Sequence, residues 1–347
     1  MRDFHYGVFI GRFQPLHLGH EAVIRGALER VETLIVVIGS SHVASNPKNP
    51  FTFADREAMF TRVFQHELTT GRMILVPLYD FEHDYDWEQN LRKGVFNAIL
   101  NHANKGGIHL HGIADFKVAL AGYGKDASSY YLRMFPEWDN IQIDIQHGTL
   151  NASDIRDDYL RRLPHYPHDA CSPQVVAWLK DFALTHRFKD LVAWKDGLAE
   201  DKARFGQGPF LAADLLIEHR DKILLITRGK AAGRGQKAMP GGFVEPGERF
   251  YDAALREGVE ETGLDANEFA DYLVGTSVAD NPSRSLRGRI VSMVFHFKIP
   301  DHVEIKAPVA GDDAAHADWY DFLSLQTDDF YEDHHTLISN TLKGEHL

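Results

Sequence analysis

Apolar, β-rich segments alternate with segments of helical periodicity through the first half of the chain. Strand and helix in regular succession favour a doubly wound α/β fold, Rossmann-like, in which helices cover both faces of a parallel sheet. Ligands bind such sheets at the carboxyl ends of the strands. The expected strands are His5–Ile10, Leu34–Ile38, Met73–Pro77, Lys117–Ala121 and Ile141–Ile145. The expected helices are His20–Arg30, Phe53–Glu67, Trp87–Asn104, Ser128–Phe135, Ser153–Leu163 and Pro173–Thr185.

The pattern changes after about residue 190. Residues 191–207 have weak periodicity and lead into Gly208 and Pro209, which favours a linker. We therefore predict a first domain at 1–190, a linker at 191–207 and an α+β domain at 208–347, in keeping with the two domains that 347 residues favour. The expected elements of the second domain are strands at Phe210–His219, Lys222–Thr227, Tyr272–Ala279 and Ile290–Ile299, and a helix at Phe250–Thr262.

Composition and charge narrow the class of protein. Hydrophobic residues make up 44% and charged residues 25%, which is ordinary for a globular protein. No apolar run reaches the ~18 residues that cross a bilayer, and the single Cys171 cannot form an intrachain disulfide, so we expect a cytoplasmic protein without a membrane partner. The net charge is −13, with 20 basic and 23 acidic residues up to Asp190 and 17 and 27 after it, which disfavours nucleic acid as a partner. Small phosphorylated substrates remain compatible with this charge, because divalent cations bridge carboxylates and phosphates.

The histidines of the chain do not form an evident metal site. Two pairs have no carboxylate or Cys cluster nearby, and we interpret them as solvated side chains rather than metal ligands. The sequence leaves open whether the chain forms a homo-oligomer. The two pairs are His165 with His168 and His334 with His335.

A phosphate-binding loop is expected directly after the first strand, in the string Gly11-Arg-Phe-Gln-Pro-Leu-His-Leu-Gly-His20. Gly11 lets a phosphate approach the backbone. Gly19 and His20 open a helix whose free N–H groups and positive dipole end attract an anion. His17 and His20 are three residues apart, so both rings can face the same phosphate.

This string resembles the signature of the HxGH nucleotidyltransferase superfamily, and Gly-Arg-Phe-Gln-Pro resembles the archaeal-type nicotinamide mononucleotide (NMN) adenylyltransferases in particular. Three further segments resemble that family in order: Phe51-Thr-Phe-Ala-Asp-Arg56, Asp80 with Trp87, and Asn151-Ala-Ser-Asp-Ile-Arg156. The resemblance covers about residues 1–170 and implies transfer of an adenylyl group from ATP to NMN, giving NAD and pyrophosphate, with Mg²⁺ on the phosphates. Asn151 and Ser153 replace the family's usual Ser and Thr, but both keep a short side chain that can cap a helix and bind phosphate.

Such a reaction needs alignment and charge neutralisation rather than a protein nucleophile. Single residues have plainer interpretations: Arg56 as a salt-bridge partner, Trp87 as an ordinary aromatic, Asp80 as a strand end. Another adenylyl- or cytidylyltransferase of the superfamily is the rival assignment, disfavoured by Gly11–Gln14 together with Trp87. The resemblance implies catalytic roles for His17, His20, Arg12 and Arg156, and nucleotide-binding roles for Gly11, Phe13, Gly19, Gly39, Arg56, Asp80, Trp87 and Ser153.

Three glutamates share one face of the helix expected at 250–262. Glu257, Glu260 and Glu261 stand at i, i+3 and i+4, and such closely spaced like charges are costly unless cations neutralise them. Hard oxygen ligands favour Mg²⁺ or Mn²⁺. Arg256 lies four residues before Glu260 and can orient it, and Gly263 suits a left-handed helix end.

These residues, with Gly242-Phe-Val-Glu-Pro-Gly-Glu248, resemble the Nudix box, although Gly258 replaces an aliphatic residue. The resemblance covers about residues 208–345 and implies metal-dependent hydrolysis of a nucleoside diphosphate linked to another moiety, with Arg256, Glu257 and Glu261 as catalytic residues. The metal, Mg²⁺ or Mn²⁺, would be held by Glu257, Glu260 and Glu261.

Segments after the box resemble Nudix members that process ADP-ribose, so cleavage of ADP-ribose to AMP and ribose 5-phosphate is the first expectation. Arg284 and Arg289, with Arg287, would bind the diphosphate or the terminal ribose phosphate, unless they are surface residues. Two alternatives stay open: the Nudix half hydrolyses a different dinucleotide, or it is a non-catalytic sensor of ADP-ribose. The segments are Asp280–Arg289 and Gly311–Ala315 with Trp319. In the second segment, Asp312 and Asp313 are candidates for a metal ligand or a general base.

Overall fold

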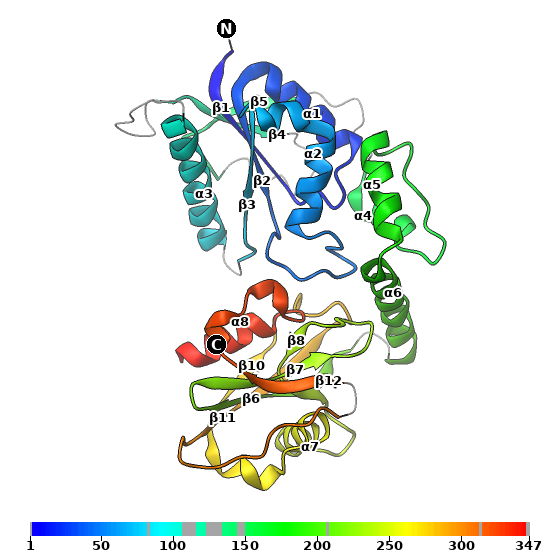
Figure 1. Ribbon diagram of the computed structural model, residues 1–347, viewed down its shortest axis with the longest axis vertical. Helices are drawn as coiled ribbons and strands as arrows, with labels where there is room; N and C mark the ends of the chain where they lie inside the picture. The colour runs from blue at the N-terminus through cyan, green and yellow to red at the C-terminus, as the bar shows by residue number, and fades with distance from the viewer. Residues whose placement is uncertain are drawn as a thin grey trace. The chain divides into compact units, whose positions relative to one another are not determined.

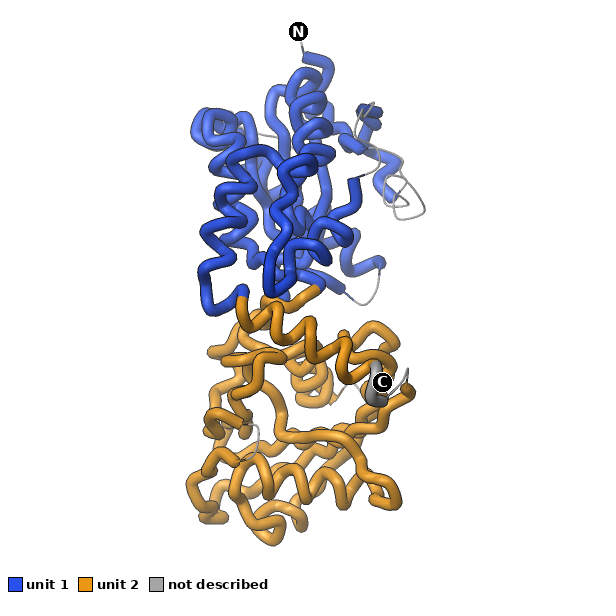
Figure 2. Tube along the Cα trace, turned by 90° about the vertical axis from the view of Figure 1, so that its right-hand side faces the viewer, with its two compact units in different colours: residues 1–43, 48–188 blue, residues 44–47, 189–347 orange. Residues whose placement is uncertain are grey.

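The computed structural model describes residues 2–81, 84–105, 116–122, 134–143, 150–205, 208–311 and 314–344. The chain divides into two compact units (Figure 2). Unit 1 contains residues 1–43 and 48–188, and unit 2 contains residues 44–47 and 189–347. Within the described ranges, no helix is long and apolar enough to cross a membrane.

Unit 1 is built on a five-stranded parallel sheet with the order β3-β2-β1-β4-β5. The doubly wound α/β fold expected for this half is therefore confirmed. The strand order reverses at β1, which lies between β2 and β4, so the carboxyl end of β1 is the position where such sheets bind ligands. The strands are β1 (Phe4–Gly11), β2 (Val31–Ile38), β3 (Met73–Pro77), β4 (Val118–Gly122) and β5 (Asp139–Gln142).

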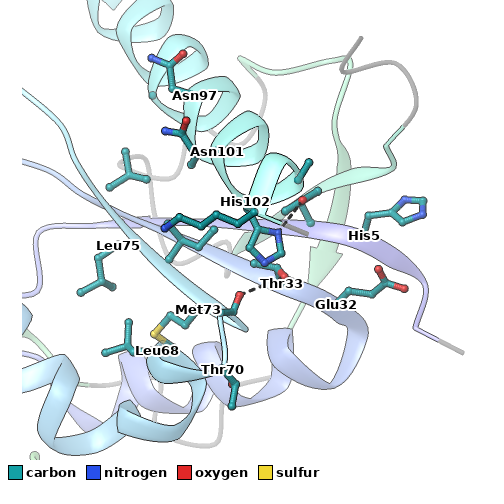
Figure 3. Close-up of a pocket in the computed structure, with 18 of the residues that line it drawn as sticks. His5, Glu32, Thr33, Leu68, Thr70, Met73, Leu75, Asn97, Asn101 and His102 are labelled. Atoms are coloured by element: carbon teal, nitrogen blue, oxygen red, sulfur yellow. Dashed lines mark hydrogen bonds between the residues drawn. The ribbon is translucent and has the colours of Figure 1, made fainter. Parts of the chain in front are cut away.

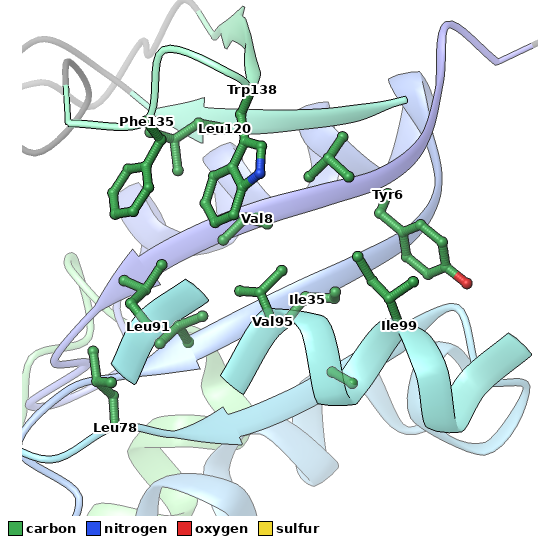
Figure 4. Packing of buried hydrophobic residues seen from close by; sticks show 13 residues of the cluster. Tyr6, Val8, Ile35, Leu78, Leu91, Val95, Ile99, Leu120, Phe135 and Trp138 are labelled. Atoms are coloured by element: carbon green, nitrogen blue, oxygen red, sulfur yellow. The ribbon is translucent and has the colours of Figure 1, made fainter. Parts of the chain in front are cut away.

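Helices lie on both faces of this sheet, with α3 on one side and α1 and α2 on the other (Figure 1). In α3, Leu91, Val95 and Ile99 are spaced by four residues and share one face. That face packs on Val8 of β1 and Ile35 of β2 (Figure 4). The helices are α1 (Leu18–Arg30), α2 (Phe53–Thr69), α3 (Asp84–Lys105), α4 (Ala152–Tyr159), α5 (Pro173–Ala183) and α6 (His186–Phe205). Of the helix expected at Ser128–Phe135, residues 128–133 lie outside the described residues, and Met134 and Phe135 are not helical.

The segment that we interpreted as a linker with weak periodicity is helical from residue 191 to 205, as most of α6. Phe188, Leu191 and Val192 are buried and stand at i, i+3 and i+4, which is a helical stripe. Charged residues interrupt the stripe further along and hide it in the sequence. The boundary between the units falls inside α6, after Phe188, and Trp194 belongs to a core cluster of unit 2 with Tyr331.

Unit 2 is a mixed sheet with the order β10-β11-β6-β7-β12, between α7 on one face and α8 on the other (Figure 1). Alternate residues of β6 face opposite sides, so Leu215 and Ile217 pack in the cluster with α7 whereas Leu216 packs in the cluster with α8. The expected α+β order is confirmed, and β8, β9, β12 and α8 are additions to it. The strands are β6 (Phe210–His219), β7 (Lys222–Arg228), β8 (Lys237–Ala238), β9 (Gly241–Phe243), β10 (Leu273–Ala279), β11 (Ile290–Ile299) and β12 (Ala314–Tyr320); the helices are α7 (Phe250–Thr262) and α8 (His334–Lys343), with short 3-10 turns at Ala266–Glu268, Ala270–Tyr272, Phe322–Ser324 and Thr327–Asp329.

Candidate active sites

Two histidines form the start of α1 in unit 1. His17 is the N-cap residue, and its Nδ1 accepts a hydrogen bond from the His20 N–H at 3.4 Å. The His20 Nδ1 accepts one from the His17 N–H at the same distance. The two rings are stacked, with centroids 3.6 Å apart and planes 23° apart. The expected pair of imidazoles therefore lies side by side at a helix N-terminus, directly after β1.

The glycines of this loop make room for neighbouring rings. A Cβ on Gly11 would lie 2.8 Å from Cζ of Phe13, and one on Gly19 would lie 3.1 Å from the His17 ring. The Phe13 ring is only 1% exposed and packs on His20 and Phe60, at centroid distances of 4.8 and 5.1 Å. The Phe13 side chain therefore supports the loop by packing, and its expected part in nucleotide binding stays a prediction.

Arg156 connects α4 to the same loop. Its Nη1 donates to the Gln14 carbonyl at 2.8 Å, and its Nη2 donates to Ser153 Oγ at 2.9 Å. Asn151 caps α4, because its side chain accepts from the Ser153 N–H at 3.0 Å. The residues that depart from the family pattern thus keep the capping geometry that the sequence predicted.

Arg56 holds two loops together through backbone carbonyls. Its guanidinium donates to the carbonyls of Arg12 at 2.8 Å, Gly39 at 2.6 Å, Ser40 at 3.0 Å and Thr52 at 3.2 Å. The side chain is 1% exposed, and burial lowers the pKa of the guanidinium to about 10. Arg56 is therefore neither a plain salt-bridge partner nor a residue with many donors left for a nucleotide. It fixes the positions of Gly39 and Arg12.

Positive charge gathers around this loop. Burial lowers the pKa of Arg156 to about 10, and the nearby charge of Arg12 acts in the same direction on both Arg56 and Arg156. Arg12 itself is exposed. The guanidinium groups of Arg12, Arg56 and Arg156 repel one another, so an anion bound near them would be stabilised.

The two remaining residues of the expected NMN site lie after β3 and on α3. Asp80 accepts a hydrogen bond from Ser40 Oγ at 3.0 Å, which connects it to the loop that Arg56 holds. Trp87 is half-buried, packs against the core under α3, and its ring centroid lies 6.4 Å from that of Phe135.

A cavity of about 1120 Å³ in unit 1 lies at the other end of the sheet (Figure 3). It is lined by residues at the starts of β1 and β2, such as His5 and Thr33, by β3, and by the carboxyl-terminal half of α3 with Asn101 and His102. None of the residues expected to bind nucleotide lines it. This cavity is therefore separate from the place that the motif and the charges define.

In unit 2, Arg256 of α7 organises the glutamates of the motif. Its Nε and Nη2 donate to the two carboxylate oxygens of Glu248 at 2.9 and 3.0 Å, and its Nη1 donates to Glu257 at 2.8 Å and Glu260 at 3.2 Å. Arg256 thus contacts Glu260, as expected, and also Glu248 and Glu257. Gly258 is buried, and a Cβ there would lie 3.0 Å from Leu215 and 3.2 Å from Phe269, so these side chains occupy the space of the aliphatic residue that it replaces.

Glu261 is the buried carboxylate of the motif. It is 5% exposed, and its Oε2 accepts the Gly241 N–H at 3.0 Å. Burial raises its pKa to about 8; the charges of Glu257 and Asp214 act in the same direction, whereas the Gly241 N–H and Arg228 oppose them. A Cβ on Gly242 would lie 2.3 Å from Glu257 Oε1, so only glycine lets that carboxylate approach the backbone.

These carboxylates fit a hard divalent cation. Among the described residues no three His, Cys, Asp or Glu side chains are grouped as a metal site, because Arg256 draws Glu257 and Glu260 while Glu261 turns to Gly241. Yet burial and nearby carboxylates raise the energy of ionised Glu261, and a divalent cation would relieve this cost with oxygen ligands alone. Two candidates, Asp312 and Asp313, lie outside the described residues.

The arginines expected to bind diphosphate are largely engaged within the protein. Arg284 is buried and donates to both carboxylate oxygens of Asp333, at 2.9 and 3.1 Å. Arg287 lies 3.8 Å from Glu332 and over the ring of Phe243, and Arg289 donates to the Asp280 carbonyl. The donor edge of Arg284 therefore faces Asp333, and its expected role as a nucleotide ligand stays a prediction.

Sequence reasoning missed Arg228. Its Nε donates to the Ala232 carbonyl at 2.9 Å, and its guanidinium lies 4.1 Å from the centre of the Tyr331 ring. Its charge acts on both Glu261 and Asp214. Its place at the end of β7, shortly before the Gly-rich loop, is a weak signal that could have drawn attention to it.

His334 corrects the interpretation of the histidine pairs. Its ring is buried, and its Nδ1 accepts the Met239 N–H at 3.1 Å. Burial lowers its pKa to about 3, so it is a neutral core residue. His165 and His168 are exposed, as expected.

Comparison with known families agrees with both motifs. Residues 8–93 match the cytidylyltransferase-like family, and residues 208–340 match the NUDIX domain family. Fold, motif geometry and these matches define a chain with a nucleotidyltransferase unit and a Nudix unit.

Relatives of each unit are known, and solved structures span both units. The nicotinamide/nicotinic acid mononucleotide adenylyltransferase of Acinetobacter baylyi is 34% identical over 191 residues, which are 55% of this chain and 93% of that protein. The ADP-ribose pyrophosphatase of Methanocaldococcus jannaschii is 39% identical over 142 residues, 41% of this chain and 78% of that protein. The crystal structure of a bifunctional NMN adenylyltransferase/ADP ribose pyrophosphatase from Francisella tularensis, complexed with AMP and a manganese ion, is 30% identical, with a TM-score of 0.81, covering 98% of this chain and 99% of that one. The chain belongs to this family of bifunctional NMN adenylyltransferase/ADP-ribose pyrophosphatases.

Proposed function

We propose that unit 1 transfers the adenylyl group of ATP to NMN, forming NAD and releasing pyrophosphate. The observation that carries this proposal is the stacked pair of His17 and His20 at the N-terminus of α1, with Arg12 and Arg156 beside the same loop. A divalent cation, which we expect to be Mg²⁺, would be carried by the ATP phosphates.

The residues of unit 1 act by position and charge. His20 and Arg12 donate to the phosphate oxygens on which negative charge increases as the NMN phosphate attacks the α-phosphorus. Arg156 holds the loop through Gln14 and presents charge to the departing pyrophosphate. Arg56 keeps Gly39 and Arg12 in place through hydrogen bonds to their backbone carbonyls. Asp80 and Trp87 would bind the nicotinamide nucleotide.

The test of this proposal is the stoichiometric formation of NAD and pyrophosphate from NMN and ATP by the purified chain. Nicotinate mononucleotide serves as the second acceptor, and CTP as the second donor. NAD formation supports the proposal. Transfer only from CTP, or only to another acceptor, would assign unit 1 to a different reaction of the superfamily.

We propose that unit 2 hydrolyses ADP-ribose to AMP and ribose 5-phosphate, with Mg²⁺ or Mn²⁺ held by Glu257, Glu260 and Glu261. The observation that carries this proposal is the buried Glu261 beside Glu257, which a divalent cation would stabilise. The bound metal supplies charge neutralisation and a more acidic water. Arg228 would hold the diphosphate, because cation–π contact and the Ala232 carbonyl fix its guanidinium near the carboxylates.

A panel of nucleoside diphosphate compounds tests this second proposal. ADP-ribose should be cleaved with Mg²⁺ or Mn²⁺ and not after chelation. Preferred cleavage of another dinucleotide would change the substrate and keep the reaction class. Tight binding of ADP-ribose without cleavage, together with a changed adenylyltransferase rate, would instead assign a sensor role to unit 2.

A further inference from the structure

A buried carboxylate outside the Nudix motif lies next to it in the fold. Asp214 is in β6 and is 7% exposed. Its Oδ2 accepts a hydrogen bond from the hydroxyl of Ser292, which is fully buried in the neighbouring strand β11. A buried carboxylate is costly and persists where its surroundings stabilise it. No part of the mechanism above uses Asp214.

Asp214 contacts the residue that holds Glu261. In the pairing of β6 with β9, Asp214 is opposite Gly241. A Cβ on Gly241 would lie 2.6 Å from Asp214 Oδ1, so the carboxylate rests against the Gly241 main chain. The N–H of this same glycine donates to Glu261. The position of Asp214 therefore affects the amide that fixes Glu261.

Burial and the neighbouring groups act on the charge of Asp214 in opposite directions, and burial has the larger effect. Burial raises its pKa, whereas the charges of Arg284, Arg287 and Arg228 and the Ser292 hydroxyl stabilise the ionised form. Arg284 is itself held by Asp333. The strand pairing and the Ser292 hydroxyl thus hold the Asp214 carboxyl group at a fixed place behind Gly241. In its ionised form Asp214 raises the pKa of Glu261.

We propose that Asp214 is a positioning residue of the hydrolase site, which fixes Glu261 through Gly241 and, in its ionised form, adds to the negative potential that binds the divalent cation. The proposal rests on the proposed function of unit 2 for the identity of the cation. A charge that is fixed and buried acts on a divalent ion more strongly than an exposed one, since water screens it less. Loss of the charge therefore weakens metal binding by about tenfold.

The test is a titration of the full-length protein with Mn²⁺ alone, in which electron paramagnetic resonance measures free Mn²⁺. Asp214→Asn should bind Mn²⁺ about tenfold more weakly than wild type, and Ser292→Ala about threefold more weakly. Glu218→Gln is the matched control. Glu218 is also in β6, it also contacts a residue of β11, His296, and it lies four residues from Asp214. Its Mn²⁺ affinity should equal that of wild type.

Two results would overturn the proposal: unchanged Mn²⁺ affinity of folded Asp214→Asn, or an equal loss in Glu218→Gln. If circular dichroism shows that Asp214→Asn does not fold, Ser292→Ala decides, and unchanged Mn²⁺ affinity in that variant overturns the proposal. Hydrolysis of ADP-ribose by wild type is measured separately. Failure of that reaction would remove the proposed substrate, while the Mn²⁺ titration would still decide the role of Asp214.

Discussion

The two candidate sites that we propose for phosphate groups have opposite arrangements of charge. In unit 1, Arg56 and Arg156 are buried cations whose donors satisfy backbone carbonyls, and the site is ready for an anion without a protein-bound metal. In unit 2, Glu257 and Glu261 are close carboxylates, which repel a diphosphate until a cation lies between them. The difference shows that buried charge alone does not define a phosphate site. The cations of unit 1 lack an anion, which the phosphate would supply, whereas the carboxylates of unit 2 lack a cation, which a metal would supply.

The largest effect of a substitution is expected in unit 2, where the carboxylates need a divalent cation. Glu261→Gln preserves size but removes one ligand charge, so hydrolysis of ADP-ribose should fall by about 10³. Adenylyl transfer by the same preparation should remain at the wild-type rate and serves as its control. Near-normal hydrolysis would show that Glu261 does not hold the cation.

In unit 1 a single donor is expected to matter less, because several cations share the charge. His20→Ala should lower kcat of adenylyl transfer by about 10² while hydrolysis continues unchanged. The measurement is steady-state NAD formation at saturating ATP and NMN. A loss confined to KM would show that His20 binds the ground state rather than the transition state.

The contrast was only partly predictable from sequence. His17 and His20 lie a few residues apart at the start of α1, and the three glutamates lie a few residues apart in α7. Local helix geometry therefore brings the members of each group together. Arg56 was harder to interpret, because its carbonyl partners at residues 12 and 39 come from other loops. The ion pair of Arg284 could not be predicted, since its partner Asp333 is 49 residues away, and Asp214 has no local signal because its neighbours come from β9 and β11.

The two sites should also differ in their response to pH. Glu261 must lose its proton to hold a cation, and its pKa is raised to about 8. Below pH 8, each unit by which the pH falls should therefore raise the Mn²⁺ concentration for half-maximal hydrolysis by about tenfold. This carboxyl has a higher pKa folded than unfolded, so its protonated form favours the metal-free fold, and this contribution is lost as pH rises from about 4.5 to 8. Hydrolysis rates over a range of Mn²⁺ concentrations measure the metal requirement, and thermal unfolding with and without Mn²⁺ measures the change in stability with pH. A metal requirement that does not change between pH 6 and 8 would contradict the prediction.

Arg228 offers a direct comparison of substrate charge and metal charge within unit 2. Arg228→Ala should raise KM for ADP-ribose about tenfold, because a cation facing the diphosphate is lost. Binding of Mn²⁺ should not weaken, since the same cation opposes a metal beside Glu261. Arg284→Lys, at an arginine whose donors face Asp333, is the comparison variant for KM. Weaker Mn²⁺ binding in Arg228→Ala would place this arginine in the support of the carboxylates instead.

The smallest expected effect concerns the segment where the helix α6 replaced an expected linker. We propose that the units remain separable, so fragment 1–188 should keep adenylyl transfer and fragment 189–347 should keep hydrolysis. Fragment 208–347 begins where the sequence placed the second domain, and it lacks Trp194, whose ring is stacked on Tyr331 with centroids 5.6 Å apart. Loss of a buried aromatic side chain leaves Tyr331 exposed, so the Tm of 208–347 should lie roughly 10 °C below that of 189–347. Trp194→Ala in fragment 189–347 is the matched variant and should reproduce most of this decrease. Equal Tm values for the two fragments would mean that α6 does not stabilise unit 2. Residues 191–207 would then act as a linker, as the sequence predicted, although they are helical up to residue 205.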